Sequence, residues 1–163
     1  MVARAALDDV DRRILVLLSE DSRRSQRALA REMSMSAPAI GERIARLERI
    51  GVIRGYGVRL DWSAAGFPMT VYLSITAVQG YKQRHLVEQL SRIPELEELI
   101  IVTGAIDLLA RFRVRDHLHL RELLTERVWQ VEGVQRTETS VSIFEIEPRN
   151  TVAELLSQPP PTA

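Results

Sequence analysis

The amino-acid sequence predicts an α+β protein with two domains, an N-terminal winged helix-turn-helix and a C-terminal ferredoxin-like αβ-sandwich with the element order βαββαβ. Three observations lead to this prediction. Apolar residues recur at helical spacing through residues 7–50, they alternate with polar residues in several segments after residue 69, and a stretch with Gly66 and Pro68 separates the two patterns. We therefore expect domains at 1–60 and 69–148, a hinge at 61–68 and a flexible tail at 149–163.

Length and composition indicate an ordinary globular chain. Of the 163 residues, 45% are hydrophobic, which is enough for a real core. Because the chain has no cysteine, disulfides and thiolate metal sites are excluded. No apolar run reaches the length of about 18 residues that a membrane span needs, and Met1–Ala6 lacks the apolar core of a signal peptide. We therefore expect a cytoplasmic protein with no membrane partner and no cofactor.

The zero net charge hides an uneven distribution. Residues 1–60 carry 12 Arg and 8 acidic residues, a net charge of +4, and the remainder carries 10 basic and 14 acidic residues, a net charge of −4. A basic first third joined to an acidic remainder indicates a module that binds a polyanion, attached to a domain with another task. A chance imbalance of a few charges is the alternative.

Helical periodicity predicts two helices before residue 34. The first covers about 8–20 and has aspartates in its first turn, where the helix dipole favours acidic side chains. Ser25 then caps a shorter helix, Gln26–Met33. Ser34 and Met35 leave room only for a tight turn before the next helix begins, which is the helix-turn-helix arrangement.

The third helix, at 36–51, is the centre of this half of the chain. Ser36 can cap its first turn, Pro38 is tolerated there, and Gly51 is suited to end it. One face is apolar, with Ile40, Ile44 and Leu47. Away from that face lie Ala39, Glu42, Arg43, Arg46 and Arg49. This pattern is that of a recognition helix, and also that of any basic surface helix.

Residues 52–60 predict a small hairpin, with short apolar runs on both sides of Gly55-Tyr56-Gly57. A hairpin directly behind a helix-turn-helix is a wing. Its arginines, Arg54 and Arg59, would reach a phosphate backbone or remain solvated charges.

The second domain is expected to contain two helices and four strands. The helices are predicted at 82–92 and 116–131, and the strands at 70–77, 96–103, 108–115 and 134–146. Two helices cover only one face of such a sheet. The other face carries Leu109, Ile101 or its neighbours, and Phe144 or Ile146, so we expect it to pair with a second subunit in a homodimer.

Five segments resemble one family. LDDVDRRIL at 7–15, SAPAIGERIARLE at 36–48 and GVIRGY at 51–56 resemble the DNA-binding half of the Lrp/AsnC (feast/famine) transcriptional regulators. VTGAID at 102–107 and GVQRTETS at 133–140 resemble the ligand-sensing half of that family. The resemblance covers about residues 7–147 with all elements in order, and as a set it is highly specific.

The resemblance implies a sequence-specific regulator of amino-acid or related metabolism that binds double-stranded DNA. It also implies that dimers assemble further, often into octamers, and that a small effector, an amino acid or a similar molecule, binds between subunits. Because a dimer presents two recognition helices, we expect a pseudo-palindromic DNA site with half-sites about one helical turn, or a multiple of it, apart. The mechanism expected is a shift in the relative placement of the dimers.

The residues expected at the DNA come from the second and third helices. Ser25 and Gln26 stand at a helix N-terminus, where backbone N–H groups favour phosphate, although Ser25 also caps the helix. The resemblance places at the DNA Gln26, Ser36, Pro38, Ala39, Arg43 and Arg46. Arg43 and Arg46 would grip guanine or a phosphate, two readings that the sequence leaves open.

The residues expected at the effector surround a Gly-x-x-Asp turn. The resemblance places there Thr103, Gly104 and Asp107, with Thr137 and Thr139 of the last strand. A β-carbon at Gly104 would crowd the turn. The backbone N–H of Gly104 would bind a carboxylate, and Asp107 would accept a hydrogen bond from an ammonium group. The alternative is that Asp107 only stabilises the turn. Ile106 and Leu109 favour an apolar side chain on the effector.

The chain departs from the family pattern at two places. Ser34 stands where the family usually has Gly in the helix-turn-helix turn, so we expect left-handed backbone strain there. Ala105-Ile106 replaces the aromatic or acidic residues common in the sensing turn, which leaves the identity of the effector open.

No catalytic or metal constellation is visible in the sequence. His117 and His119 are two apart on a helix and point in different directions, so surface histidines are expected. An enzyme of the sirohaem decarboxylase type is the main alternative, since it is similar in both halves. The sensing turn and the third helix have no histidine, which argues against it. A third alternative, an amino-acid-binding module with a vestigial DNA domain, conflicts with the arginine face of the third helix.

Overall fold

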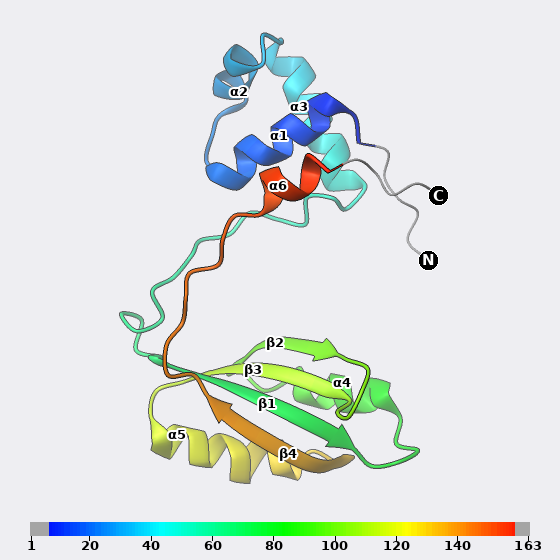
Figure 1. The fold of residues 1–163 in the computed structure, drawn as a ribbon, viewed down its shortest axis with the longest axis vertical. Helices are drawn as coiled ribbons and strands as arrows, with labels where there is room; N and C mark the ends of the chain where they lie inside the picture. Colours follow the sequence, from blue (N-terminus) through cyan, green and yellow to red (C-terminus); the bar gives the residue numbers. More distant parts are fainter. Residues whose placement is uncertain (1–6, 159–163) are drawn as a thin grey trace. The chain divides into compact units, whose positions relative to one another are not determined.

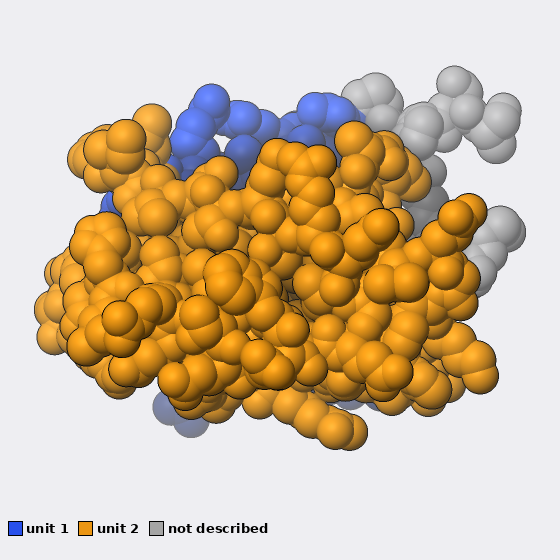
Figure 2. Space-filling model, turned by 90° about the horizontal axis from the view of Figure 1, so that it is seen from below, with its two compact units in different colours: residues 1–58, 147–163 blue, residues 59–146 orange. Residues whose placement is uncertain are grey.

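The computed structural model describes residues 7–158, and these separate into two compact units (Figures 1 and 2). Unit 1 comprises Met1–Val58 and Glu147–Ala163, and unit 2 comprises Arg59–Ile146. The chain therefore passes between the units twice, once after Val58 and once after Ile146.

Unit 1 contains the three predicted helices, each started by a side chain that the sequence marks. They are α1 (Asp9–Glu20), α2 (Gln26–Glu32) and α3 (Ala37–Arg49). Asp8 and Asp11 form a reciprocal capping box at the start of α1, and Ser25 and Ser36 accept from the backbone N–H groups of Ala28 and Ala39. The apolar faces meet in one core that includes Ile14, Leu17, Leu29, Ile40, Ile44 and Leu47.

The tight turn between α2 and α3 has the strained backbone that the sequence predicts. Ser34 has φ of 53°, and no other non-glycine residue among residues 7–158 has a positive φ. A β-carbon is unfavourable in this left-handed conformation.

The predicted wing is wrong: the structure assigns no strand to residues 52–60. Val52 and Ile53 instead donate their backbone N–H groups to the carbonyl of Leu47, so they complete the end of α3 and pack on its core. Beyond them, Tyr56, Val58 and Leu60 are exposed. A hairpin of these residues would not be packed on an apolar surface, and an isolated two-stranded hairpin is marginally stable at best.

The region predicted as a flexible tail at 149–163 contains a short helix, α6 (Val152–Leu156), in unit 1. Arg12 of α1 donates to the carbonyl of Leu156 at 2.7 Å, and Asn150 donates to Ser19 at 3.1 Å. The prediction is therefore wrong for this helix, because contacts with α1 order it. Residues 159–163 lie outside the described residues.

Unit 2 has the predicted order βαββαβ in an antiparallel sheet with the strand order β2-β3-β1-β4 (Figure 1). The strands are β1 (Met69–Ala77), β2 (Leu96–Ile101), β3 (Leu108–Val114) and β4 (Val134–Val141). The helices are α4 (Gln83–Leu90) and α5 (His117–Glu122). One core lies between the helices and one sheet face, with Val71, Leu73, Ile75, Leu86, Leu90, Leu108, Ala110, Phe112, Leu120 and Leu123.

Two predicted elements of unit 2 differ in extent. The helix expected at 116–131 continues after α5 as a π-helical turn, η1 (Leu123–Arg127), and a 3-10 turn, η2 (Val128–Gln130). The wider turn allows Leu123 and Val128, five residues apart, to be buried together. The last strand ends at Val141, which pairs with Val71, because β1 begins at Met69 and offers no partner to residues 143–146.

Candidate functional site

The N-termini of α2 and α3 form one candidate site. Ser25 and Ser36 are exposed and cap their helices, which confirms the capping role for both. Gln26 lies at the start of α2 next to Gly41 of α3, where an added β-carbon would stand 2.8 Å from its Oε1 atom. Pro38 is exposed in the first turn of α3, and Ala39 beside it is half-buried. The structure thus brings these predicted residues together at the helix-turn-helix.

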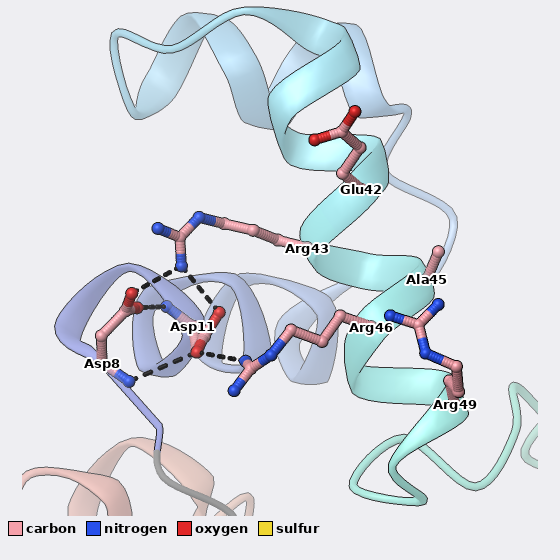
Figure 3. A pocket seen from close by; sticks show the side chains of 7 residues that line it. All are labelled: Asp8, Asp11, Glu42, Arg43, Ala45, Arg46 and Arg49. Atoms are coloured by element: carbon pink, nitrogen blue, oxygen red, sulfur yellow. Dashed lines mark hydrogen bonds and ion pairs between the residues drawn. The ribbon is translucent and has the colours of Figure 1, made fainter.

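Arg43 and Arg46 extend from α3 toward the start of α1 (Figure 3). Arg43 Nη1 donates to Asp8 at 2.7 Å and to Asp11 at 2.9 Å, and Arg46 Nη1 donates to the other oxygen of Asp11 at 2.9 Å. Asp11 is only 1% exposed, whereas the arginine side chains remain partly accessible. One buried carboxylate therefore binds two arginines of α3.

The charges of this cluster support each other. The N–H of Asp11 and the guanidinium of Arg43 lower the pKa of Asp8 below its ordinary value. The carboxylates of Asp8 and Asp11 raise the pKa of Arg43. Both arginines lie away from the apolar face of α3 as expected, and each is also ion-paired to α1, which the sequence did not predict. The signal in the sequence was the matched i, i+3 spacing of Asp8 with Asp11 and of Arg43 with Arg46.

Three further arginines of the helix-turn-helix have no acidic partner among the described residues. Within residues 7–158, Arg27 and Arg31 of α2 and Arg49 of α3 form no ion pair, and all three are exposed. Figure 3 shows Arg49 on the last turn of α3, beyond Arg46. These side chains are free to bind phosphate. An exposed, unpaired Arg cannot be told from a paired one by sequence pattern alone.

The second candidate site is the turn between β2 and β3, where Asp107 has a structural role. Its Oδ2 atom accepts from the backbone N–H of Ala77 at 2.8 Å, and its own N–H donates to the carbonyl of Ile75 at 3.0 Å. Asp107 therefore ties the turn to the end of β1. This geometry agrees with the alternative that Asp107 stabilises the turn, and among the described residues Oδ1 accepts no hydrogen bond.

Gly104 satisfies a backbone requirement in the same turn. Its φ is 125°, which favours glycine, but an added β-carbon would meet no atom within 4 Å. The expectation that a β-carbon would crowd the turn is wrong, because the constraint lies in the backbone angle. Thr103, next to it, is exposed.

The strand residues expected at the effector lie on two faces of the sheet. Thr137 pairs with Ile75 and Thr139 with Leu73, so both lie on the face that the helices cover. Thr137 also accepts from the indole N–H of Trp129 at 3.0 Å. Leu109 pairs with Ser74 on the opposite, open face. The structure therefore brings Asp107 and Thr137 to the two sides of Ile75, and it separates Leu109 from the two threonines.

The histidines form no metal site. Within residues 7–158 no group of three His, Cys, Asp or Glu side chains could hold a metal ion. His119 is buried, contrary to the expectation of a surface histidine. Its Nδ1 atom accepts from the N–H of Arg115, so the proton lies on Nε2, which faces Glu95 at 3.0 Å. Arg127 completes this cluster by donating to the other Glu95 oxygen.

Comparison with protein families matches both units. The AsnC-type helix-turn-helix domain matches residues 7–48, and the Lrp/AsnC ligand binding domain matches residues 70–152. An uncharacterized HTH-type transcriptional regulator from Pyrococcus abyssi is 36% identical over 85% of this chain and 87% of its own length. The HTH-type transcriptional regulator AldR from Mycobacterium tuberculosis is 34% identical over 88% of this chain and 81% of its own.

Solved structures agree with the fold. Escherichia coli AsnC superposes with a TM-score of 0.84 at 20% identity, covering 91% of this chain and 99% of its own. The Mycobacterium tuberculosis AldR structure gives a TM-score of 0.72 at 30% identity over 86% of this chain and 97% of its own. A Neisseria meningitidis regulator in complex with L-Met gives a TM-score of 0.83 at 20% identity, covering 89% of this chain and 95% of its own.

The matches of both units to one family of regulators, and the names of the relatives, identify a DNA-binding transcriptional regulator. The chain belongs to the Lrp/AsnC family of such regulators. Because its relatives are named as regulators, the family speaks against the decarboxylase alternative, and the chain is not an enzyme. No helix among the described residues is both long enough and apolar enough to span a membrane.

Proposed function

We propose that this regulator controls genes of amino-acid or related metabolism and that an amino acid modulates its DNA binding. The observation that carries the proposal is the match of residues 70–152 to the ligand binding domain of the family, attached to an intact helix-turn-helix. The Neisseria relative of the same fold holds L-Met, which supports an amino acid as the class of effector.

At the DNA, the proposed reading surface is the N-terminal part of α3 with the start of α2. Ser36, Pro38 and Ala39 stand at the end of α3 that enters the major groove in helix-turn-helix proteins. Ser25 and Gln26 lie at an N-terminus whose N–H groups favour phosphate. Arg43 and Arg46 stay in the proposed surface through their exposed edges. Arg49 and Arg27, which have no ion pair within residues 7–158, would add phosphate contacts.

At the effector, the proposed contacts are those of the turn between β2 and β3. The N–H groups around Thr103 and Gly104 would bind the carboxylate, and the free Oδ1 atom of Asp107 would accept from the ammonium group. Thr137 and Thr139 would border the side chain. Leu109 lies on the open face, across the sheet from both threonines. It would therefore contact the effector only in a site that is formed with the partner subunit.

The proposed assembly is a homodimer that associates further, with an octamer as the expected form. The open face of the sheet carries Ile100, which is 40% exposed, beside the half-buried Tyr72 and Leu109. Phe144 and Ile146 follow in an extended segment and are more than 80% exposed. Apolar surface of this extent is unfavourable in water, and a second copy of the chain would cover it.

A two-step experiment tests the effector. Thermal shift of the full-length protein with each of the common amino acids identifies one that stabilises it, and fluorescence anisotropy then measures DNA affinity with and without that amino acid. Asp107→Asn keeps an oxygen for the Ala77 N–H but removes the charge. We expect this variant to keep the melting temperature of the free protein and to lose the ligand-induced rise. A full rise in the variant contradicts the proposed ammonium contact.

A further inference from the structure

The chain passes between the two units after Val58 and after Ile146, and the segments beside these crossings are called the first connector (residues 59–68) and the second connector (residues 142–147). They are far apart in sequence, and both border the sheet where β1 begins and β4 ends. Few backbone hydrogen bonds join the connectors to the sheet. One of them runs from the N–H of Ser142 to the carbonyl of Thr70 at 2.9 Å. Side chains must therefore supply most of their attachment to the sheet.

The first connector has structure of its own. Asp61 accepts from the N–H of Ala64 at 3.0 Å, and Phe67 donates its N–H to the carbonyl of Trp62 at 2.8 Å. The rings of Trp62 and Phe67 meet edge to face, with their centres 6.4 Å apart. The connector is thus a folded turn whose Trp62 ring is held in one orientation.

Arg113 of β3 contacts this turn. Its guanidinium carbon lies 5.6 Å from the centre of the Trp62 ring, within the range of a cation–π interaction. The side chain is only 13% exposed, so the interaction is largely desolvated and stronger than a surface contact.

The same guanidinium contacts the second connector. Arg113 Nη1 donates to Glu145 at 2.9 Å and to the hydroxyl of Thr70, which itself donates to Glu145. Thr70 is 1% exposed and belongs to the first residues of β1. Arg113 Nε donates to Glu97 at 2.6 Å, which fixes the guanidinium from the β2 side.

We propose that Arg113 is a positioning residue that fastens both connectors to the open face of the sheet, so that a shift of β3 moves both chain crossings together. Each connector leads to unit 1, one into the end of α3 and the other into α6. In this proposal, a change on the sheet face reaches the helix-turn-helix through these two crossings of the chain. The role in DNA binding rests on the proposed function, whereas the fastening itself does not.

Arg111 is the matched control. It is also on β3, two residues away on the same face, and its contacts are with Glu97 at 3.0 Å and Glu98 at 3.4 Å. Among the described residues it makes no hydrogen bond or ion pair with either connector. Removing its charge disturbs the same sheet face and the shared Glu97, and it leaves in place the contacts of Arg113 with Trp62 and Glu145.

Amide hydrogen exchange of the full-length protein tests the proposal. In Arg113→Met we expect exchange at residues 64–67 and at Ser142 to accelerate at least tenfold, with less than twofold change in Arg111→Met. Glu145→Gln is the decisive variant, because within residues 7–158 Glu145 makes no hydrogen bond or ion pair with the first connector. In this variant Arg113 loses part of its attachment, so amide exchange at residues 64–67 should be at least threefold faster than in the wild type. Unchanged exchange there in Glu145→Gln overturns the proposal, even if Arg113→Met fails to fold.

A DNA arm separates this inference from the proposed function. The wild-type protein first selects a duplex with two half-sites, and affinity is then measured for this duplex and for a duplex with one half-site. We expect Arg113→Met to lower the ratio of the first affinity to the second at least tenfold. Affinity for one half-site should stay within twofold. A ratio equal to that of the wild type limits Arg113 to a structural role. If the wild-type protein bound the selected duplex no more tightly than an unrelated duplex, the proposed function would be rejected. The hydrogen-exchange result would not be affected.

Discussion

Asp11 Oδ1 and Arg43 Nη1 lie 2.9 Å apart, which joins the first turn of α1 to the middle of α3. The second oxygen of Asp11 binds Arg46, one helical turn further along α3. Because the carboxylate is buried and its partners reach solvent, this contact fixes the rotation of α3 and leaves the edges of both arginines accessible. The orientation of the recognition helix thus depends on α1.

Asp11→Asn should destabilise the protein by about 2 kcal/mol. Breaking a fully buried ion pair costs about 3 to 5 kcal/mol, and the partial exposure of Arg43 and Arg46 reduces this cost. Urea unfolding at neutral pH measures the change. Asp9→Asn is the control, since Asp9 is exposed in the same turn and its loss should cost less than about 0.5 kcal/mol. Equal losses in the two variants would show that Asp11 acts only through the helix dipole.

Arg49→Ala and Arg43→Ala should separate DNA contact from stability. Arg49 has no ion pair within residues 7–158, so its removal should leave the unfolding free energy unchanged and weaken DNA binding. The slope of log affinity against log salt should fall by about 1 if one phosphate contact is lost. Arg43→Ala should weaken binding to a selected duplex and also lower stability. An Arg49→Ala protein with wild-type affinity and salt slope would exclude Arg49 from the interface.

Ser34→Gly should stabilise the protein by about 0.5 kcal/mol. The left-handed conformation of Ser34 costs about 1 kcal/mol, and the greater flexibility of glycine in the unfolded chain offsets part of the gain. Thermal and urea unfolding measure the difference. Ser22→Gly, in an exposed turn without positive φ, should instead destabilise slightly. A loss of stability in Ser34→Gly would show that the serine side chain contributes more than the strain removes.

Acid should weaken unit 1 through Asp8. The folded state lowers the pKa of this carboxyl through the Asp11 N–H and Arg43, whereas the unfolded chain keeps a value of about 3.9. Its contribution to stability is therefore present above about pH 4 and is lost as the pH falls through the lowered folded value. Asp8→Asn keeps a capping side chain without the charge and should flatten the pH dependence of urea unfolding between about pH 4 and 2. The same pH dependence in both proteins would contradict this assignment.

Local signals in the sequence were sufficient for most of the fold. Ser25 and Ser36 act three residues away through their own hydroxyls, and Ser34 is strained by the length of its turn, so each could be predicted from its neighbours. The order βαββαβ followed from alternation and periodicity in the same way.

Features that depend on distant residues could not be predicted. Arg43 meets Asp11 across 32 positions, and α6 is ordered by Arg12 across 144 positions. Val52 and Ile53 resemble a strand in composition, yet the free carbonyl of Leu47 binds both of their N–H groups. Asp107 and Thr137 lie on the two sides of Ile75, but the pairing register that puts Leu109 on the other face is a property of the whole sheet.

The most direct test of the account is the affinity of the full-length protein for a duplex selected from random DNA, compared with a scrambled duplex over a series of salt concentrations. We predict a two-fold symmetric selected site, an affinity at least about 10³ times that for the scrambled duplex at physiological salt, and a steep fall of both affinities with salt. Equal affinities for the two duplexes, or selection of no symmetric site, would contradict the claim that paired copies of α3 read DNA sequence.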